Sequence, residues 1–190
     1  MTMSRFFMLA TALPLLALAA PAAAQEEIGV ARFQQLELVG GGHVTVRHGS
    51  VQRVRLLRGS RGISDFAVDR QGRLTIRACR TSCRDYDLRV EIVTPSVEAL
   101  AIRGGGAIET EGAFPRQGSL AAAVTGGGAI DTRALAPRSV AAAVTGGGSI
   151  LTDPGASLVA AVRGGGSVTY WGDPQVVQSV SGGGSVERGR

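Results

Sequence analysis

The chain has 190 residues, with 20 basic residues that are all arginine, 15 acidic residues and a net charge of +5. Its acidic and basic residues are interleaved, as in RVRLLRGSRGISDFAVDRQGR (53–73), which argues against the one-signed basic stripe of a nucleic-acid-binding protein. This length fits a single domain with its own core.

Residues 1–24 have the pattern of a secretory signal peptide. Arg5 precedes the apolar stretch FFMLATALPLLALAA, and small residues at Ala22 and Ala24 mark a cleavage site before Gln25. A membrane anchor is the alternative, but the stretch is too short to span a bilayer and Pro14 interrupts it. We therefore expect an exported protein, in the periplasm, at the cell surface or in the medium, with no membrane insertion. One mature domain, 25–190, remains.

Two cysteines, Cys79 and Cys83, lie in ACRTSCR (78–84). An exported protein meets an oxidising compartment, so we expect a disulfide between them. Extended chain would hold their Cα atoms roughly 13 Å apart, whereas a disulfide needs less than about 7 Å, so the intervening residues must turn. A metal site is the alternative, but His43 and His48 are distant in sequence and no other histidine exists.

Triple glycines recur along the chain, and from residue 104 onward their starts lie 22, 20, 18 and 18 residues apart. A β-branched residue stands two places before each of these glycine triplets and another two places after it, as in AAVTGGGAIDT and AAVTGGGSILT. Turn residues such as TDPGAS and WGDPQ separate the units. Each unit thus predicts a strand, a glycine corner, a strand and a turn. The flanking glycines of the corners are Gly40, Gly42, Gly104, Gly106, Gly126, Gly128, Gly146, Gly148, Gly164, Gly166, Gly182 and Gly184.

This period predicts an all-β protein, a parallel β-helix or β-solenoid with rungs of about 18–22 residues. Alternation places Leu120, Ala122 and Val124 on the inner face, and Ala121 and Ala123 on the outer one. Residues 96–190 hold the glycine-corner repeats, and 25–95 form a less regular β-rich part, with DRQGR (69–73) as a hairpin turn. The sequence leaves open whether 25–95 complete the solenoid or cap it. It predicts no amphipathic helix after residue 24.

The glycines do not fit the common ligand-binding loops. A P-loop needs a lysine, which the chain lacks, and a dinucleotide fingerprint needs a helix after the glycines. Calcium-binding β-rolls need a nine-residue period with a regular aspartate. No Ser-His-acid arrangement or paired carboxylates stand out. We therefore expect no catalytic residues, no metal and no cofactor. Tyr170 and Trp171 could stack on a sugar or cover a corner of the fold, and we favour packing.

FQQLELVGGGHVTVRHG, GRLTIRA, DLRVEIVTPSVEALAIRGGGAI and the later GGGAI and GGGSI corners resemble the bacterial exported family called putative auto-transporter adhesin, head GIN domain. The resemblance spans nearly all of 25–190 and implies a β-helical fold, export and an adhesive role, without catalytic residues. Gly127 and Gly147 stand where that family often has serine, and Ala129 and Ser149 where it often has aspartate.

Two functions follow as expectations. The first is an exported, non-enzymatic interaction module, adhesin-like, that binds a surface glycan or protein through its solenoid faces. The alternative is a periplasmic structural or envelope-maintenance protein without adhesion; a β-helix carbohydrate-active enzyme is a distant third. We expect neither an auto-transporter barrel nor an anchor in this chain, which weakens the first. The last unit, VSGGGSVERGR, has no evident cap, which allows a homodimer through that open end.

Overall fold

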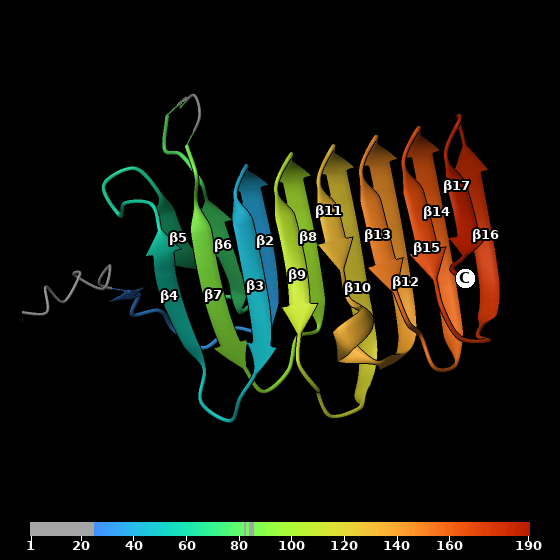
Figure 1. The fold of residues 1–190 in the computed structure, drawn as a ribbon, viewed down its shortest axis with the longest axis horizontal. Coiled ribbons are helices and arrows are strands. Elements are labelled where there is room, and N and C mark those ends of the chain that lie inside the picture. The colour runs from blue at the N-terminus through green and yellow to red at the C-terminus, as the bar shows by residue number, and fades with distance from the viewer. Residues whose placement is uncertain (1–24, 82, 84–85) are drawn as a thin grey trace, which may run out of the picture.

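The computed structural model describes residues 25–81, 83 and 86–190; the expected signal peptide, 1–24, lies outside them. The described chain is all-β, with two sheets face to face and one short 3-10 helix, η1 (Arg133–Leu135) (Figure 1). None of its helices is long and apolar enough to cross a bilayer.

The nine-stranded sheet has, in spatial order, β1 (Glu26–Glu27), β4 (Arg53–Arg58), β7 (Arg89–Thr94), β3 (His43–His48), β9 (Ala107–Glu111), β11 (Ala129–Asp131), β13 (Ser149–Thr152), β15 (Ser167–Tyr170) and β17 (Ser185–Arg188). The eight-stranded sheet has β16 (Gln175–Ser181), β14 (Ser157–Gly164), β12 (Pro137–Gly146), β10 (Gln117–Gly126), β8 (Ala99–Gly104), β2 (Gln35–Gly40), β6 (Arg73–Arg77) and β5 (Asp65–Val68).

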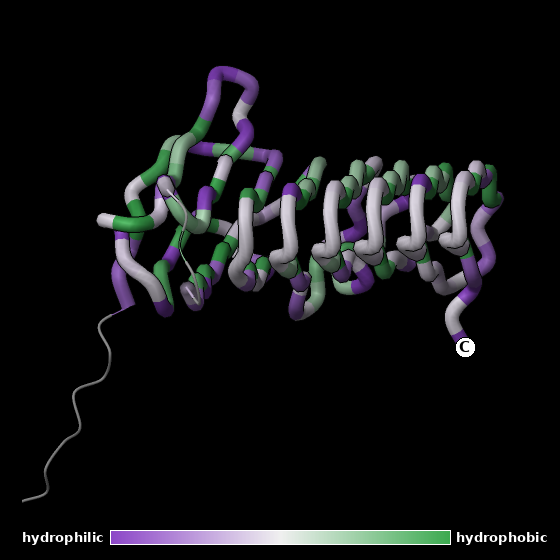
Figure 2. The backbone as a smooth tube through the Cα atoms, turned by 90° about the horizontal axis from the view of Figure 1, so that it is seen from above, coloured by the Kyte–Doolittle hydropathy of each residue, from purple (hydrophilic) through white to green (hydrophobic). Residues whose placement is uncertain are grey.

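From β8 onward each repeat gives one strand to each sheet, and equivalent strands pair in parallel. The register aligns equivalent residues, so Val124 lies beside Ile102 on one side and Val144 on the other. Seen from above, the glycine corners form a row of pale segments that link the two sheets (Figure 2). Each repeat therefore extends each of the two sheets by one strand.

The N-terminal part continues both sheets but in a different spatial order. β2 and β3 pair with β8 and β9, and β6 and β7 pair in turn with β2 and β3, all in parallel. Antiparallel pairs β1–β4, β4–β7 and β5–β6 then make both sheets mixed. The predicted hairpin at DRQGR joins β5 to β6, where the Gly72 amide donates to the Asp69 carbonyl.

Alternation along the strands fills the core as the sequence predicts. Leu120, Ala122 and Val124 are buried, while Ala121 and Ala123 are exposed. Burying a strand's leucine and valine contributes about 1.5–3 kcal/mol for each side chain. The alanine between them keeps the two sheets close, because a larger side chain would have to displace the facing strand.

The first glycine of each corner has a backbone conformation that other residues rarely adopt. Gly146 has φ +116°, and a Cβ there would lie 2.6 Å from the Gly126 carbonyl oxygen in the previous repeat. The middle glycine, Gly147, would place a Cβ in open space. Close backbone stacking therefore needs glycine at the first position and tolerates a side chain at the second.

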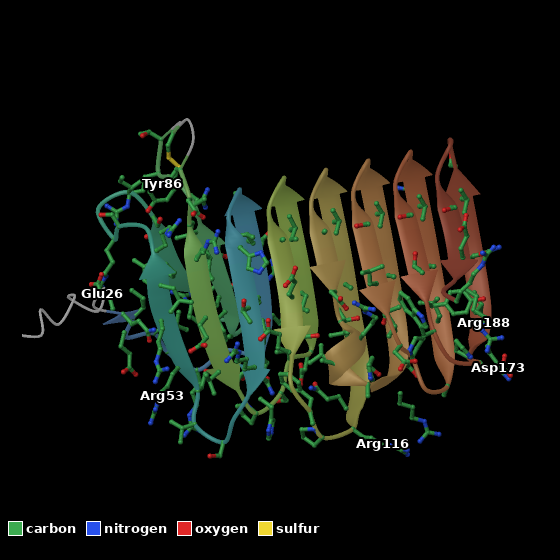
Figure 3. The ribbon with its side chains drawn as sticks, in the orientation of Figure 1. Glu26, Arg53, Tyr86, Arg116, Asp173 and Arg188 are labelled. Carbon is green, nitrogen blue, oxygen red and sulfur yellow. A yellow bond between two sulfur atoms is a disulfide. The ribbon has the colours of Figure 1, made fainter. Side chains whose placement is uncertain are left out.

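The expected disulfide between Cys79 and Cys83 is present, with Cα atoms 6.2 Å apart. It closes the loop between β6 and β7 near Tyr86, which Figure 3 labels at that end of the molecule. The Tyr86 hydroxyl accepts a hydrogen bond from the Ser60 amide at 2.6 Å and shares one with the buried Ser64 hydroxyl at 2.9 Å. These bonds tie the disulfide loop to the segment between β4 and β5.

Candidate interaction surface

The outer face of the eight-stranded sheet is built from small, uncharged side chains over β8, β10, β12, β14 and β16. We call this surface the alanine face. It consists of Ala99, Ala101, Ser119, Ala121, Ala123, Thr125, Ser139, Ala141, Ala143, Thr145, Ser157, Val159, Ala161, Gln175, Val177, Ser179 and Ser181. Strand alternation turns each of these residues away from the core. Arg103 and Arg163 bring charge to its border in the column nearest the glycine corners, and Glu37 on β2 lies beside Ala101 and pairs with Arg103.

The register arranges the alanine face in columns that cross the strands. One column runs Ala99, Ala121, Ala141, Val159, Val177 from β8 to β16. Val159 and Val177 are among the most exposed large apolar side chains, at 55% and 66%. Because valine is larger than alanine, the side chains of this column protrude further from the sheet at β14 and β16 than at β8 and β10. We call the column raised at β14 and β16 and low at β8 and β10.

The outer face of the nine-stranded sheet has the opposite character. Arg47 donates to the Glu111 carboxylate at 2.7 Å, and Arg55 donates to Glu91 at 3.2 Å. His43 lies 3.4 Å from the Glu109 carboxylate on the same face. Charged groups on this face thus have partners in neighbouring strands, and a partner protein would have to displace or desolvate them.

Two ionisable side chains have displaced pKa values, both through ion pairs within the chain. The Arg58 guanidinium donates to Asp87 at 2.7 Å and lowers the pKa of that carboxyl, with Arg89 contributing as well. The carboxylate of Asp131 raises the pKa of Arg133 through their hydrogen bonds. Each shift has an ion pair with a neighbouring side chain as its main cause, so both shifts reflect structural pairing.

Tyr170 and Trp171 end β15, on the turn that leads to β16. The Arg133 guanidinium carbon lies 4.9 Å from the Trp171 ring centroid, and the Gly189 backbone lies so close that a Cβ there would overlap the indole. Tyr170 packs against the core. These contacts give both aromatic residues a packing role; a sugar-binding role stays a prediction.

The same end of the molecule holds an ion pair between Arg188 and Asp173, 3.6 Å apart (Figure 3). Asp173 precedes a proline in a turn, as the sequence indicates. In the last repeat the inward residues are less covered than in the repeat before: Val180 is 42% exposed, whereas its equivalent Val162 is buried.

Two surface cavities lie in the N-terminal part of the chain. One of about 710 Å³ borders the disulfide and includes His43 and Asp87, and one of about 690 Å³ lies between Phe33, Gln52 and Thr94. The Gln52 side chain donates to the Phe33 carbonyl and accepts from its amide, so its polar atoms are used within the fold. Among the described residues, no group of three or more His, Cys, Asp or Glu is placed to hold a metal ion.

The sequence indicated the outward alanines but not the surface they form. A single strand such as SLAAAVT shows only that alternate residues point outward. The signal that was available is the absence of charge at the outward positions of the strands that precede the glycine corners, between Arg103 and Arg163. The ion pairs of the other sheet gave no such signal, because partners such as Arg47 and Glu111 lie 64 residues apart.

A family model described as "Putative auto-transporter adhesin, head GIN domain" matches residues 32–118 and 115–174. No curated protein matches the chain. Among solved structures, a putative adhesin from Bacteroides fragilis has 16% sequence identity and a TM-score of 0.55, with coverage of 88% of this chain and 98% of that one. This similarity shows a shared fold.

Two other structures match more loosely. A putative lipid binding protein from Parabacteroides distasonis has 14% identity and a TM-score of 0.43, with 88% and 96% of the two chains covered. A putative cell adhesion protein from Clostridium sporogenes has 10% identity and a TM-score of 0.39, with 87% and 98% covered.

Proposed function

The chain belongs to the family of putative auto-transporter adhesins with a head GIN domain, and we propose that it is an exported, non-enzymatic interaction module that docks a partner through its alanine face. The observation that carries this proposal is that the outer face of β8–β16 has no charge inside the border marked by Arg103 and Arg163, whereas the outer face of the other sheet is rich in ion pairs. Protein docking surfaces exclude charge from their centre and place it at the rim. Arg103 and Arg163 lie at such a rim.

The parallel, in-register pairing of the repeats supports a β-solenoid for residues 96–190. In this proposal, 25–95 belong to the same domain, because β2 and β3 pair directly with β8 and β9. The antiparallel strands β1, β4 and β5 then end the stack on that side. An elongated stack suits adhesion, since it presents a long flat face rather than an enclosed pocket.

Export is the second part of the proposal. The signal-peptide pattern of residues 1–24, the disulfide between Cys79 and Cys83 and the adhesin family all favour an oxidising compartment outside the cytoplasm. Protease treatment of intact producing cells tests the location. Digestion in intact cells supports a surface protein; protection until the outer membrane is opened favours the periplasmic structural role.

Docking itself is tested with two arginine substitutions that are matched in position and charge. Ala141→Arg places a cation in the centre of the alanine face, and Ser149→Arg places one on the outer face of the other sheet in the same repeat. Fluorescently labelled protein is applied to producing cells and to a panel of surface glycans. We expect Ala141→Arg to lose binding and Ser149→Arg to keep it. Equal binding by both variants would show that the alanine face is not the docking surface.

A further inference from the structure

We propose that the partner of the alanine face is a second copy of the same face, so that two chains dock face to face around a two-fold axis. This inference rests on the proposed docking role of the alanine face. Its starting point is the column that is low at Ala99 and Ala121 and raised at Val159 and Val177. A two-fold interface places each patch against the same patch of the other copy, so it must be complementary to itself.

A two-fold axis that lies along β12 satisfies this condition. Rotation about it keeps each column in place and reverses the order of the strands. Strand β14 then faces β10 of the second copy, and β16 faces β8. Val159 therefore meets Ala121, and Val177 meets Ala99, so the raised half of each column fits the low half of the other. Ala141 lies on the axis and meets itself.

The same rotation places no arginine directly opposite another. In the column nearest the glycine corners, Arg163 faces Thr125 of the second copy and Arg103 faces Ser181. Arg103 of one copy and Arg163 of the other lie one strand apart across the contact, and Arg103 keeps its ion pair with Glu37. Thr and Ser hydroxyls can accept hydrogen bonds from guanidinium groups. Each arginine stays at the border of the contact, where water still reaches it, so docking buries no unpaired charge.

Other partners fit this surface less well. The alanine face offers a sugar no aromatic ring to stack on. Docking against the opposite, ionic face of another copy would bring the pairs Arg47–Glu111 and Arg55–Glu91 against alanines and strip their water without replacement. Small side chains against small side chains allow two sheets to approach closely at little cost in side-chain entropy.

The size of the face places the contact among the smaller specific interfaces. Five strands spaced about 4.8 Å apart, each contributing seven residues at about 3.3 Å, give roughly 500 Å² for each copy. The total of roughly 1,000 Å² is at the lower limit for a specific interface. We therefore expect a weak dimer in solution, which becomes effective when many copies are displayed on facing surfaces.

Sedimentation equilibrium over a wide concentration range tests the dimer. We expect the mass of the purified protein to rise from monomer to dimer, and Ala141→Arg to weaken the dimer at least ten-fold. Ser149→Arg, on the other sheet, should dimerise like the wild type. Circular dichroism checks that both variants keep the β spectrum. A monomer at every concentration would overturn the inference.

Cysteine cross-linking tests the geometry with substitutions that add little bulk. Oxidation should link Ala141→Cys into a covalent dimer, because this residue lies on the axis, and leave Ser149→Cys monomeric. Gln178→Cys, on the exposed end strand β16, reports on end-to-end pairing. Cross-linking at Gln178 but not at Ala141 would replace the face-to-face dimer by an end-to-end one.

The binding assay separates this inference from the proposed function. If the protein stays monomeric while Ala141→Arg still abolishes binding to cells or glycans, the inference fails and the alanine face docks a different partner. If Ala141→Arg changes neither dimerisation nor binding, both fail. Dimerisation that is lost in Ala141→Arg together with cell binding supports both.

Discussion

Replacing Gly146 by alanine tests whether the first glycine of a corner is required by the backbone. Its φ of +116° is costly for any other residue, by about 1–3 kcal/mol. The added Cβ would lie 2.6 Å from the Gly126 carbonyl oxygen, which is backbone and cannot rotate away. Relieving this overlap requires a backbone shift that costs about 1–3 kcal/mol more.

The neighbouring glycine provides the matched control. Gly147 has no atom within 4 Å of an added Cβ and has no left-handed φ. Gly147→Ala is thus expected to change the free energy of unfolding by less than about 0.5 kcal/mol. Gly146→Ala is expected to lower it by about 2–5 kcal/mol, against typical total stabilities of about 5–15 kcal/mol.

Thermal unfolding followed by circular dichroism measures the difference. For a chain of this size, each kcal/mol shifts Tm by about 2–4 °C, so Gly146→Ala should melt about 5–15 °C below the wild type and Gly147→Ala close to it. Equal losses of stability in the two variants, or no loss in Gly146→Ala, would refute the reasoning. Glycine would then not be required at the first corner position by close backbone stacking between repeats.

Three further outcomes are expected. Ala142→Leu should lower the free energy of unfolding in urea by about 1–3 kcal/mol through overpacking, whereas Ala141→Leu, on the exposed side, should change it by less than about 0.5 kcal/mol; similar effects would contradict the inward-outward assignment. Replacing Cys79 and Cys83 by serine should cost about 2 kcal/mol for so short a loop, measured in the same way, and no cost would mean that the loop is held by other contacts. Because Asp87 has a lowered pKa in the folded state, its ion pairs stabilise the fold above its ordinary value near 3.8 and this contribution is lost as pH falls through the lower, folded value. Asp87→Asn should therefore flatten the decline of Tm below pH 4, and an unchanged decline would assign acid sensitivity to other carboxylates.

The repeats were predictable because two local signals agree at each unit. Alternation fixed which side chains point inward, and the glycine triplets fixed where the chain turns from one sheet to the other. Ile102, Val124 and Val144 stand at the same distance before their glycines, and the structure aligns them in one buried column. Equivalent strands pair in register because a shift by one residue would turn these side chains from the core to the solvent.

The N-terminal part could not be ordered from sequence in the same way. Its β-runs were recognisable, but they have no shared period that would fix their neighbours. Strand β6 lies beside β2 although the Leu74 and Leu36 that pair there are 38 residues apart. The antiparallel pairing of β4 with β7 likewise depends on loop closure over three dozen residues, which local propensity does not encode.

The alanine face was hidden for a related reason. In one strand, an outward alanine gives no sign of a functional surface. Only the register between strands shows that the outward alanines of neighbouring strands lie side by side. For Tyr170 and Trp171 the sequence allows stacking on a sugar or packing, and it favours packing. The contacts of Trp171 with Arg133 and Gly189 give this residue a packing role, and sugar binding stays a prediction.

Nothing in the fold requires the alanine face to be neutral. The other sheet is built from the same repeats, and its outward positions carry Glu109 and Asp131 in parallel strands without disturbing the register. Outward charges would improve solubility and protect the sheet against unwanted association. A flat, neutral surface therefore carries a cost that folding does not demand. Docking explains that cost, and it implies that Ala141→Arg should leave Tm unchanged while removing association.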